Sequence, residues 1–181
     1  MTSRPDIETI DSREVYANNW IRVHEDRVRR RDGSEGIYGV VEKPEFVVVA
    51  ALADGCLEMV QQYRYPISRR TWELPMGTAG PKGTDALTMA AMELREETGL
   101  AADSIQSLGN IYPAPGTMNQ LGHVILATGL RTVGPAREIE EQDMVCRSTS
   151  VDAVWQMVDD GQIVESNSLA ALAILKVKGH I

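Results

Sequence analysis

Residues 84–100 read TDALTMAAMELREETGL, and they are the most informative stretch of the chain. Its apolar residues recur at spacings of three and four and form one stripe: Leu87, Ala90, Ala91 and Leu94. Thr84 or Asp85 is suited to cap the beginning of a helix, and Gly99 stands where a left-handed residue commonly ends one. The sequence therefore predicts a helix from Thr84 to Thr98.

Three glutamates of this helix, Glu93, Glu96 and Glu97, gather on one face, because residues three and four apart lie over one another. At about 100° per residue, the three carboxylates fall within about 100° of arc. Like charges at these spacings destabilise an isolated helix, so we expect a cation among them. Clustered carboxylate oxygens suit Mg²⁺ or Mn²⁺. The alternative is a solvated acidic face, which needs no ligand.

A glycine-rich segment precedes the helix and reads WELPMGTAGPKG at residues 72–83. Such a segment lets the backbone approach a ligand closely. Together with ELREETGL at residues 93–100, it resembles the signature of the Nudix hydrolase family, GX5EX7REUXEEXGU, in which U is a bulky apolar residue. The lead-in ELPMG at residues 73–77 is typical of the sugar-nucleotide branch of that family.

The chain departs from the signature in three ways. Met92 stands where the family has arginine, and Thr84 falls where it has the upstream glutamate. The loop after Gly77 is also one residue longer. Met92 and Thr84, together with Gln120 farther along the chain, motivate an alternative function, in which a catalytically weak domain of this family senses a nucleotide or another metabolite.

The resemblance covers nearly the whole chain and implies an α/β fold, a Nudix-type α/β/α sandwich of mixed sheets with a small N-terminal antiparallel sheet. Residues 1–43 would form this N-terminal β extension and complete a homodimer, and residues 44–181 would form the hydrolase domain. The residue pattern agrees, since Phe46–Leu52 is a continuous apolar run suited to a strand that is buried on both faces. Asp32-Gly33 predicts a hairpin turn within the N-terminal sheet.

Two further local expectations concern the ends of the chain. The first dozen residues are polar and acidic, and we expect them to be loosely ordered. Near the other end, Ser168–Lys176 is predicted to be a helix that is capped by Ser166 or Asn167.

The resemblance also implies a substrate, a nucleoside diphosphate linked to a sugar, with ADP-ribose favoured. Gln61–Tyr65 resembles the RQYR strand of ADP-ribose pyrophosphatase-like proteins. Arg64 is expected to contact phosphate, because a guanidinium matches phosphate oxygens in bidentate fashion. A salt bridge to Glu73 is a compatible alternative. Glu73 and Gly116, the latter in a loop that resembles the substrate loop of the family, are the other expected substrate contacts.

Trp20 is a third candidate on the substrate side. In this branch the N-terminal sheet reaches the partner subunit, so Trp20 is expected to stack on the nucleobase there, as aromatic faces do well. The alternation of Trp20 and Tyr38 with charged residues is equally explained by an ordinary amphipathic strand.

Catalysis would need a metal and a base. The resemblance implies that Glu93, Glu96 and Glu97 hold Mg²⁺ or Mn²⁺, with the Met76 carbonyl as a further ligand, and Glu97 is also counted as catalytic. An activated water needs a general base within hydrogen-bond reach. Relatives place it on a loop after the helix.

Two segments could supply this base. Gln120 occupies a place often held by glutamate, but an amide cannot take a proton. Glu141 is therefore favoured, followed by Glu140, both in the charged segment 137–143. A solvated acidic loop is the alternative.

The composition argues against several other classes of function. The net charge is −8, from 26 acidic and 18 basic residues, which disfavours binding to nucleic acid or to anionic membranes. The two cysteines lie far apart and suggest neither a zinc site nor a disulfide framework. The polar start and the absence of a run of about 18 apolar residues lead us to expect a cytoplasmic protein that does not enter membranes.

Overall fold

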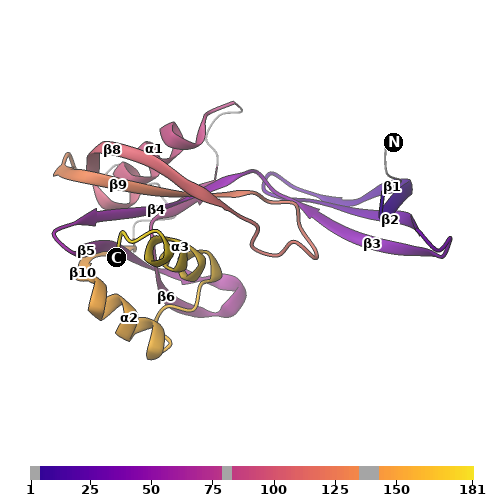
Figure 1. Cartoon of the computed structure of the whole chain (residues 1–181). Helices are drawn as coiled ribbons and strands as arrows, with labels where there is room; N and C mark the ends of the chain where they lie inside the picture. Colours follow the sequence, from indigo (N-terminus) through magenta and orange to yellow (C-terminus); the bar gives the residue numbers. More distant parts are fainter. Residues whose placement is uncertain (1–4, 79–82, 135–142) are drawn as a thin grey trace. The chain divides into compact units, whose positions relative to one another are not determined.

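A computed structural model describes residues 5–78, 83–134 and 143–181. The chain forms two compact units, which we call unit 1 and unit 2. Unit 1 contains Met1–Pro44 and Tyr112–Gln120, and unit 2 contains Glu45–Ile111 and Leu121–Ile181. Figure 1 labels the elements of both units. The segment Tyr112–Gln120 thus belongs to unit 1, although the sequence-based division assigns it to the hydrolase domain.

Unit 1 is built around an antiparallel sheet with the strand order β1-β2-β3. Its strands are β1 (Ile7–Ala17), β2 (Arg22–Arg30) and β3 (Glu35–Glu42). Gly33 adopts a φ of +87° in the turn between β2 and β3, a conformation that favours glycine. Asp32 Oδ1 accepts hydrogen bonds from Ser34 N at 2.9 Å and from Ser34 Oγ at 2.7 Å. The predicted hairpin turn is confirmed.

The expectation of a loosely ordered start is wrong for residues 7–12, because β1 already begins at Ile7, and residues 1–4 lie outside the described residues. Every residue of β1 except Ile10 is exposed, so the strand has no buried stripe to announce it. Its order comes from backbone pairing with β2 along nearly its whole length. Cross-strand ion pairs accompany this pairing, such as Arg13 with Glu25 at 2.9 Å.

The segment Tyr112–Gln120 closes unit 1 at the end of β3. Val41 N donates to Thr117 O at 2.8 Å, and Asn119 N donates to Val41 O at 3.3 Å. The Gln120 side-chain amide donates to Pro44 O at 2.8 Å. These bonds attach the segment to residues that precede it by about 75 positions.

Unit 2 contains a seven-stranded mixed sheet in the order β10-β5-β4-β9-β8, with β6 paired to β5 and β7 paired to β4. Only β4 and β9 run parallel among the described pairs. The strands are β4 (Phe46–Ala53), β5 (Cys56–Arg64), β6 (Arg69–Glu73), β7 (Met76–Thr78), β8 (Leu100–Ile111), β9 (Gly122–Thr132) and β10 (Val145–Ser150). A short 3₁₀ helix, η1 (Tyr65–Ile67), joins β5 to β6. The helices are α1 (Ala86–Thr98), α2 (Val151–Asp159) and α3 (Ser166–Val177).

Strand β4 lies between two apolar layers. Its odd-numbered residues Val47, Val49 and Ala51 pack in one cluster with Met89 and Leu94 of α1. Its even-numbered residues pack in a second cluster, which includes Val154 of α2 and Leu172 of α3. Helix α1 therefore covers one face of the sheet, and α2 and α3 cover the other (Figure 1). This is the predicted α/β/α sandwich, with the predicted strand buried on both faces.

The ends of α1 confirm the local signals in the sequence. Asp85 Oδ1 accepts hydrogen bonds from Leu87 N at 3.0 Å and Thr88 N at 3.1 Å, so Asp85 is the N-cap. Gly99 has a φ of +73° and donates its N–H to Arg95 O at 2.9 Å.

The predicted cap of α3 is wrong. Glu165 takes that position, and its carboxylate accepts from Asn167 N at 2.9 Å and from Ser168 N at 2.8 Å. Its longer side chain folds back over the first turn, a role usually filled by shorter residues. In the part of the chain that the structure describes, no helix has the length and apolar character that a membrane span requires.

Candidate functional site

The backbone between β6 and β7 meets the acidic face of α1. Glu73 ends β6, and Leu74-Pro75 leads to Met76, the first residue of β7. Met76 N donates to Glu97 Oε2 at 3.0 Å, and Glu97 is only 1% exposed. Glu97, one of the three glutamates predicted to bind metal, is thus hydrogen-bonded to Met76, whose carbonyl is the further predicted ligand.

Gly77 brings a second glutamate against this segment. A Cβ atom at Gly77 would lie 2.1 Å from the carboxyl carbon of Glu93 and 2.1 Å from its Oε1. Real Cβ contacts are never so short, so the carboxylate occupies the space that only glycine leaves open. The backbone is therefore closely approached here by a side chain of this protein, and the predicted close approach to a ligand stays a prediction.

The chemistry of these residues fits a hard divalent cation, because the carboxylates and a backbone carbonyl offer only oxygen donors. Glu96 is half-buried, as is Glu93, on the same helix. Within residues 5–78, 83–134 and 143–181, however, no three His, Cys, Asp or Glu side chains converge as the ligands of one ion do.

Arg64 and Glu73 form the ion pair that the sequence offered as an alternative. Arg64 Nε lies 2.9 Å from Glu73 Oε1 and 3.1 Å from Oε2, and Nη2 also donates to Oε2. Glu73 is fully buried, and this burial raises the pKa of its carboxyl, although the hydrogen bonds from Arg64 counteract part of the effect. The guanidinium covers both carboxylate oxygens, so the pair has one defined geometry.

Arg64 remains able to contact a ligand. Desolvation lowers the pKa of its guanidinium, but the hydrogen bonds that it donates to Glu73 and the charges of Glu73, Glu165 and Glu97 outweigh this and raise the pKa overall. Its side chain is 35% exposed, and the hydrogen bonds to described residues involve Nε and Nη2. Nη1 is the nitrogen with which it could reach a phosphate.

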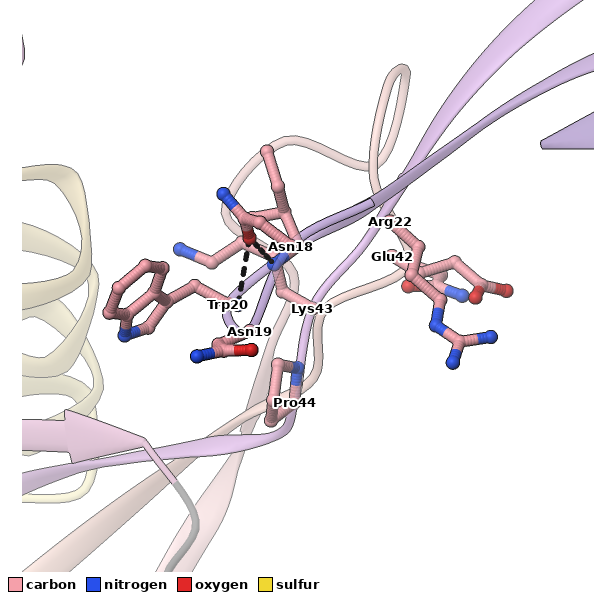
Figure 2. A pocket seen from close by; sticks show the side chains of 9 residues that line it. Asn18, Asn19, Trp20, Arg22, Glu42, Lys43 and Pro44 are labelled. Atoms are coloured by element: carbon pink, nitrogen blue, oxygen red, sulfur yellow. Dashed lines mark hydrogen bonds between the residues drawn. The ribbon is translucent and has the colours of Figure 1, made fainter. Parts of the chain in front are cut away.

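Unit 1 carries a pocket of about 380 Å³ around the turn between β1 and β2. It is lined by Asn18, Asn19, Trp20, Ile21, Arg22, Glu42, Lys43, Pro44 and Asn119. Trp20 is 71% exposed, and Figure 2 shows its ring extending away from Arg22 and Glu42. The volume lies in the usual range of small-molecule pockets, about 300–1,000 Å³.

The turn itself presents Trp20. Asn18 Oδ1 accepts hydrogen bonds from Trp20 N at 2.8 Å and Ile21 N at 2.9 Å, the dashed lines in Figure 2. Because β2 begins only at Arg22, Trp20 lies in a turn. The alternative that treats Trp20 as part of an amphipathic strand is therefore wrong.

The loop residues singled out in the sequence have different surroundings. Gly116 is exposed, and a Cβ there would meet nothing within 4 Å. Gln120 is buried and holds Pro44 O. Its amide thus has a structural task in unit 1 that needs a donor, which a carboxylate could not supply.

Glu140 and Glu141 lie outside the described residues, so their role as base stays a prediction. Sequence reasoning missed Ser168, whose Oγ accepts a hydrogen bond from Leu74 N at 2.9 Å in the segment before β7. It also missed Glu165, which accepts a hydrogen bond from Ser168 Oγ at 3.1 Å. The only sequence signal was a serine placed in a strongly apolar helix, SLAALAIL at residues 168–175.

Comparisons with known proteins show which family the chain resembles. Residues 7–41 match a family described as the nucleoside diphosphate sugar hydrolase N-terminal domain. The chain is 38% identical over 174 residues to an ADP-ribose pyrophosphatase of Mycobacterium tuberculosis (strain ATCC 25618 / H37Rv), covering 95% of this chain and 83% of the relative. It is 27% identical over 173 residues to an ADP-ribose pyrophosphatase of Bacillus subtilis (strain 168), covering 94% and 93%.

A solved structure described as an ADP compounds hydrolase superposes with a TM-score of 0.86 over the full length of both chains. The identity of the two sequences is only 18%, so this likeness speaks for the fold alone.

Proposed function

Because the chain belongs to the Nudix hydrolase family, in its ADP-ribose pyrophosphatase-like branch, we propose that it cleaves the diphosphate of ADP-ribose into AMP and ribose 5-phosphate. The observation that carries this proposal is the junction of β7 and α1, where Met76 N binds Glu97 and Gly77 packs on Glu93. Both relatives are named for hydrolysis, which favours the enzyme over the nucleotide sensor.

The substrate is an anionic diphosphate, and the chain has a net charge of −8. A bridging cation is therefore needed, and Glu93, Glu96, Glu97 and the Met76 carbonyl are the residues that would hold Mg²⁺ or Mn²⁺. When bound, such an ion neutralises developing charge on the diphosphate and lowers the pKa of a coordinated water.

Arg64 would bind and orient the diphosphate through Nη1. Glu73 supports this role, because its two carboxylate oxygens hold Nε and Nη2 and fix the plane of the guanidinium before the substrate arrives. A positioned cation loses little freedom on binding, so more of its interaction with phosphate contributes to orientation.

Trp20 of one copy would stack on the nucleobase that is bound in the site of a second copy of the chain. An exposed indole beside a pocket of about 380 Å³ supports this, since aromatic rings stack well on bases. Gly116 would line the substrate from its exposed loop. Glu141, or Glu140 next to it, would accept the proton of the attacking water.

A homodimer is the assembly that we propose. The sheet of unit 1 exposes apolar side chains that a small sheet normally covers: Ile7, Val15, Tyr16, Ile37 and Tyr38. A second copy of the chain would supply this cover. Light scattering coupled to size exclusion should give twice the mass of one chain, and a monomer at micromolar concentration would contradict the proposal.

The enzyme proposal is tested with a panel of nucleotide sugars. The purified protein should release AMP from ADP-ribose with Mg²⁺, and it should lose this activity when the ion is removed with a chelator. Glu97→Gln should lower kcat and weaken the binding of Mn²⁺ measured by electron paramagnetic resonance. Asp159→Asn on the exposed end of α2 is the charge-matched control and should change neither. Bound metal without release of AMP would overturn the substrate assignment.

A further inference from the structure

Helix α3 holds the segment that leads into β7 through a buried serine. Leu74 is fully buried, and its N–H donates to Ser168 Oγ at 2.9 Å. Ser168 is itself fully buried, in the first turn of α3. The next residue, Pro75, has no N–H. The Leu74 N–H is therefore the last backbone donor before β7, and α3 holds the segment through it.

Glu165 decides how the serine hydroxyl is turned. Ser168 Oγ donates its proton to Glu165 Oε2 at 3.1 Å. A hydroxyl has one proton and two lone pairs, so with the proton given to Glu165 the oxygen presents a lone pair to Leu74 N–H. Glu165 is fixed in turn, because it caps α3 through Asn167 N and Ser168 N.

The segment from Leu74 to Met76 is stiff. Proline fixes its own φ and restricts the residue before it to extended conformations. Pro75 O also accepts a hydrogen bond from Val49 N at 2.8 Å. A shift at Leu74 therefore passes to Met76, whose N–H holds Glu97.

We propose that Ser168, oriented by Glu165, is a positioning residue for hydrolysis, which sets the Met76 backbone and through it the Glu97 carboxylate. This inference rests on the proposed function and extends it to the opposite face of the sheet. The cap of α3 and the acidic face of α1 become one connected polar path through the backbone of Leu74, Pro75 and Met76.

A purely structural serine would give a different result. It would satisfy the buried Leu74 amide and contribute to stability only, because an unpaired buried donor is costly. Two measurements separate the roles: the division of the loss between kcat and KM, and the hydrogen exchange of the Met76 amide in the metal-free protein.

Ser168→Ala is the main variant. It should lower kcat for ADP-ribose about tenfold and leave KM within about twofold, since the loss of one buried hydrogen bond displaces a catalytic carboxylate without touching the substrate. In the metal-free protein, exchange at Met76 should become about tenfold faster than in the parent. Ser166→Ala, an exposed hydroxyl of the same turn, should behave like the parent.

Leu175→Val is the control for stability. It removes a methylene from the same helix two turns farther along, in the core. It should lower the Tm while leaving kcat and the relative exchange rate of Met76 unchanged. If Ser168→Ala does not fold, Glu165→Gln is the second variant. Its neutral amide is a weaker acceptor for the serine hydroxyl, so kcat should fall and Met76 exchange should rise by smaller factors.

The outcomes are distinguishable from failure of the proposed function. If the parent protein hydrolyses ADP-ribose and Ser168→Ala matches Leu175→Val in kcat and in Met76 exchange, the positioning role is overturned and the enzyme stands. If the parent cleaves no nucleotide sugar, both proposals fall. A selective loss of kcat with faster Met76 exchange supports the positioning role.

Discussion

The sheets of the two units are stabilised in different ways. In unit 2, β4 is buried on both faces between α1 and the other helices. In unit 1, Val28 is the only buried apolar side chain among the described residues. Cross-strand ion pairs such as Arg27 with Glu35 join its strands instead, and exposed pairs of this kind contribute only about 0–1 kcal/mol each.

This contrast separates two tasks. The proposed function requires Gly77 and Glu97 to hold their positions to a fraction of an ångström, and both lie beside the close-packed core of unit 2. The exposed indole of Trp20 lies in unit 1, where a surface is available for recognition. We therefore expect substitutions in unit 2 to affect folding and kcat, and those in unit 1 to affect association and KM.

The largest expected effect is on folding. Leu94 of α1 is fully buried, so Leu94→Ala should lower the free energy of unfolding by about 2–5 kcal/mol. Ile37 in β3 is 67% exposed, so Ile37→Ala should change the free energy of unfolding by less than about 0.5 kcal/mol. The same substitution should weaken self-association. Chemical denaturation and light scattering measure the two quantities. Equal losses of stability would break the comparison.

The next effect is on catalysis. Gly77→Ala places a methyl group 2.1 Å from the carboxyl carbon of Glu93, so that carboxylate must move. Displacement of this kind should lower kcat/KM about 10²-fold. Gly39→Ala in unit 1 is the matched control, because a Cβ there meets nothing within 4 Å. A Gly77→Ala enzyme with the activity of the parent would show that the position of Glu93 is unimportant.

A smaller effect concerns the buried carboxylate of unit 2. Arg64→Ala leaves Glu73 without its cation and should lower the free energy of unfolding by about 1–3 kcal/mol. This value lies between those for exposed and for buried ion pairs, because Arg64 is partly exposed. Arg13→Ala in unit 1, whose partner Glu25 is exposed, should cost much less.

The loss in Arg64→Ala should depend on pH. Burial raises the pKa of Glu73 in the folded protein above its unfolded value, and removing Arg64 raises it further. With the raised pKa, the folded protein binds more protons than the unfolded chain. The free energy of unfolding therefore falls as pH rises from the unfolded pKa of Glu73 through its folded pKa. The difference from the parent should therefore be greatest at neutral pH and narrow on acidification. A constant difference from neutral to acidic pH would contradict this explanation.

The smallest effect is at the helix cap. Asp85→Ala should lower the Tm by about 2 °C, and Asp85→Asn, which can still cap, by less. Hydrogen bonds from the Thr88 side chain and backbone lower the pKa of Asp85 below its ordinary value of 3.8. The stability that it contributes is present above that value and lost as pH falls through the folded pKa.

Asp32→Ala is the substitution in unit 1 that corresponds to Asp85→Ala in unit 2. Hydrogen bonds from the side chain and backbone of Ser34 lower the pKa of Asp32, as those from Thr88 lower the pKa of Asp85. A Tm for Asp85→Ala that stays below that of the parent by the same amount at every acidic pH would contradict the assignment.

Local signals predicted much of unit 2. Asp85 and Gly99 mark the ends of α1 because caps depend on residues within one turn. The apolar run Phe46–Leu52 predicted a doubly buried strand because both of its faces need apolar side chains. The ion pair of Arg64 with Glu73, offered as an alternative, is present, although the β5–β6 register places Val60 opposite Glu73 and Arg64 opposite Arg69.

The rest depended on contacts that no local pattern contains. Strand β1 has polar residues on both faces, so neither period of two nor of 3.6 is visible in it. Ser168 meets Leu74 across 94 positions of sequence. The attachment of Tyr112–Gln120 to unit 1 likewise became evident only from its bonds to Val41 and Pro44.

The attachment of Tyr112–Gln120 limits how this protein can be recombined with others. The chain passes between the units three times, because a piece of unit 1 is inserted between two strands of unit 2. Residues 7–41 look like an independent module when they are compared with other sequences. Grafted elsewhere without residues 112–120, however, they would leave the backbone of Val41 without its partners. Gene fusions or shuffling between relatives should therefore exchange both pieces together.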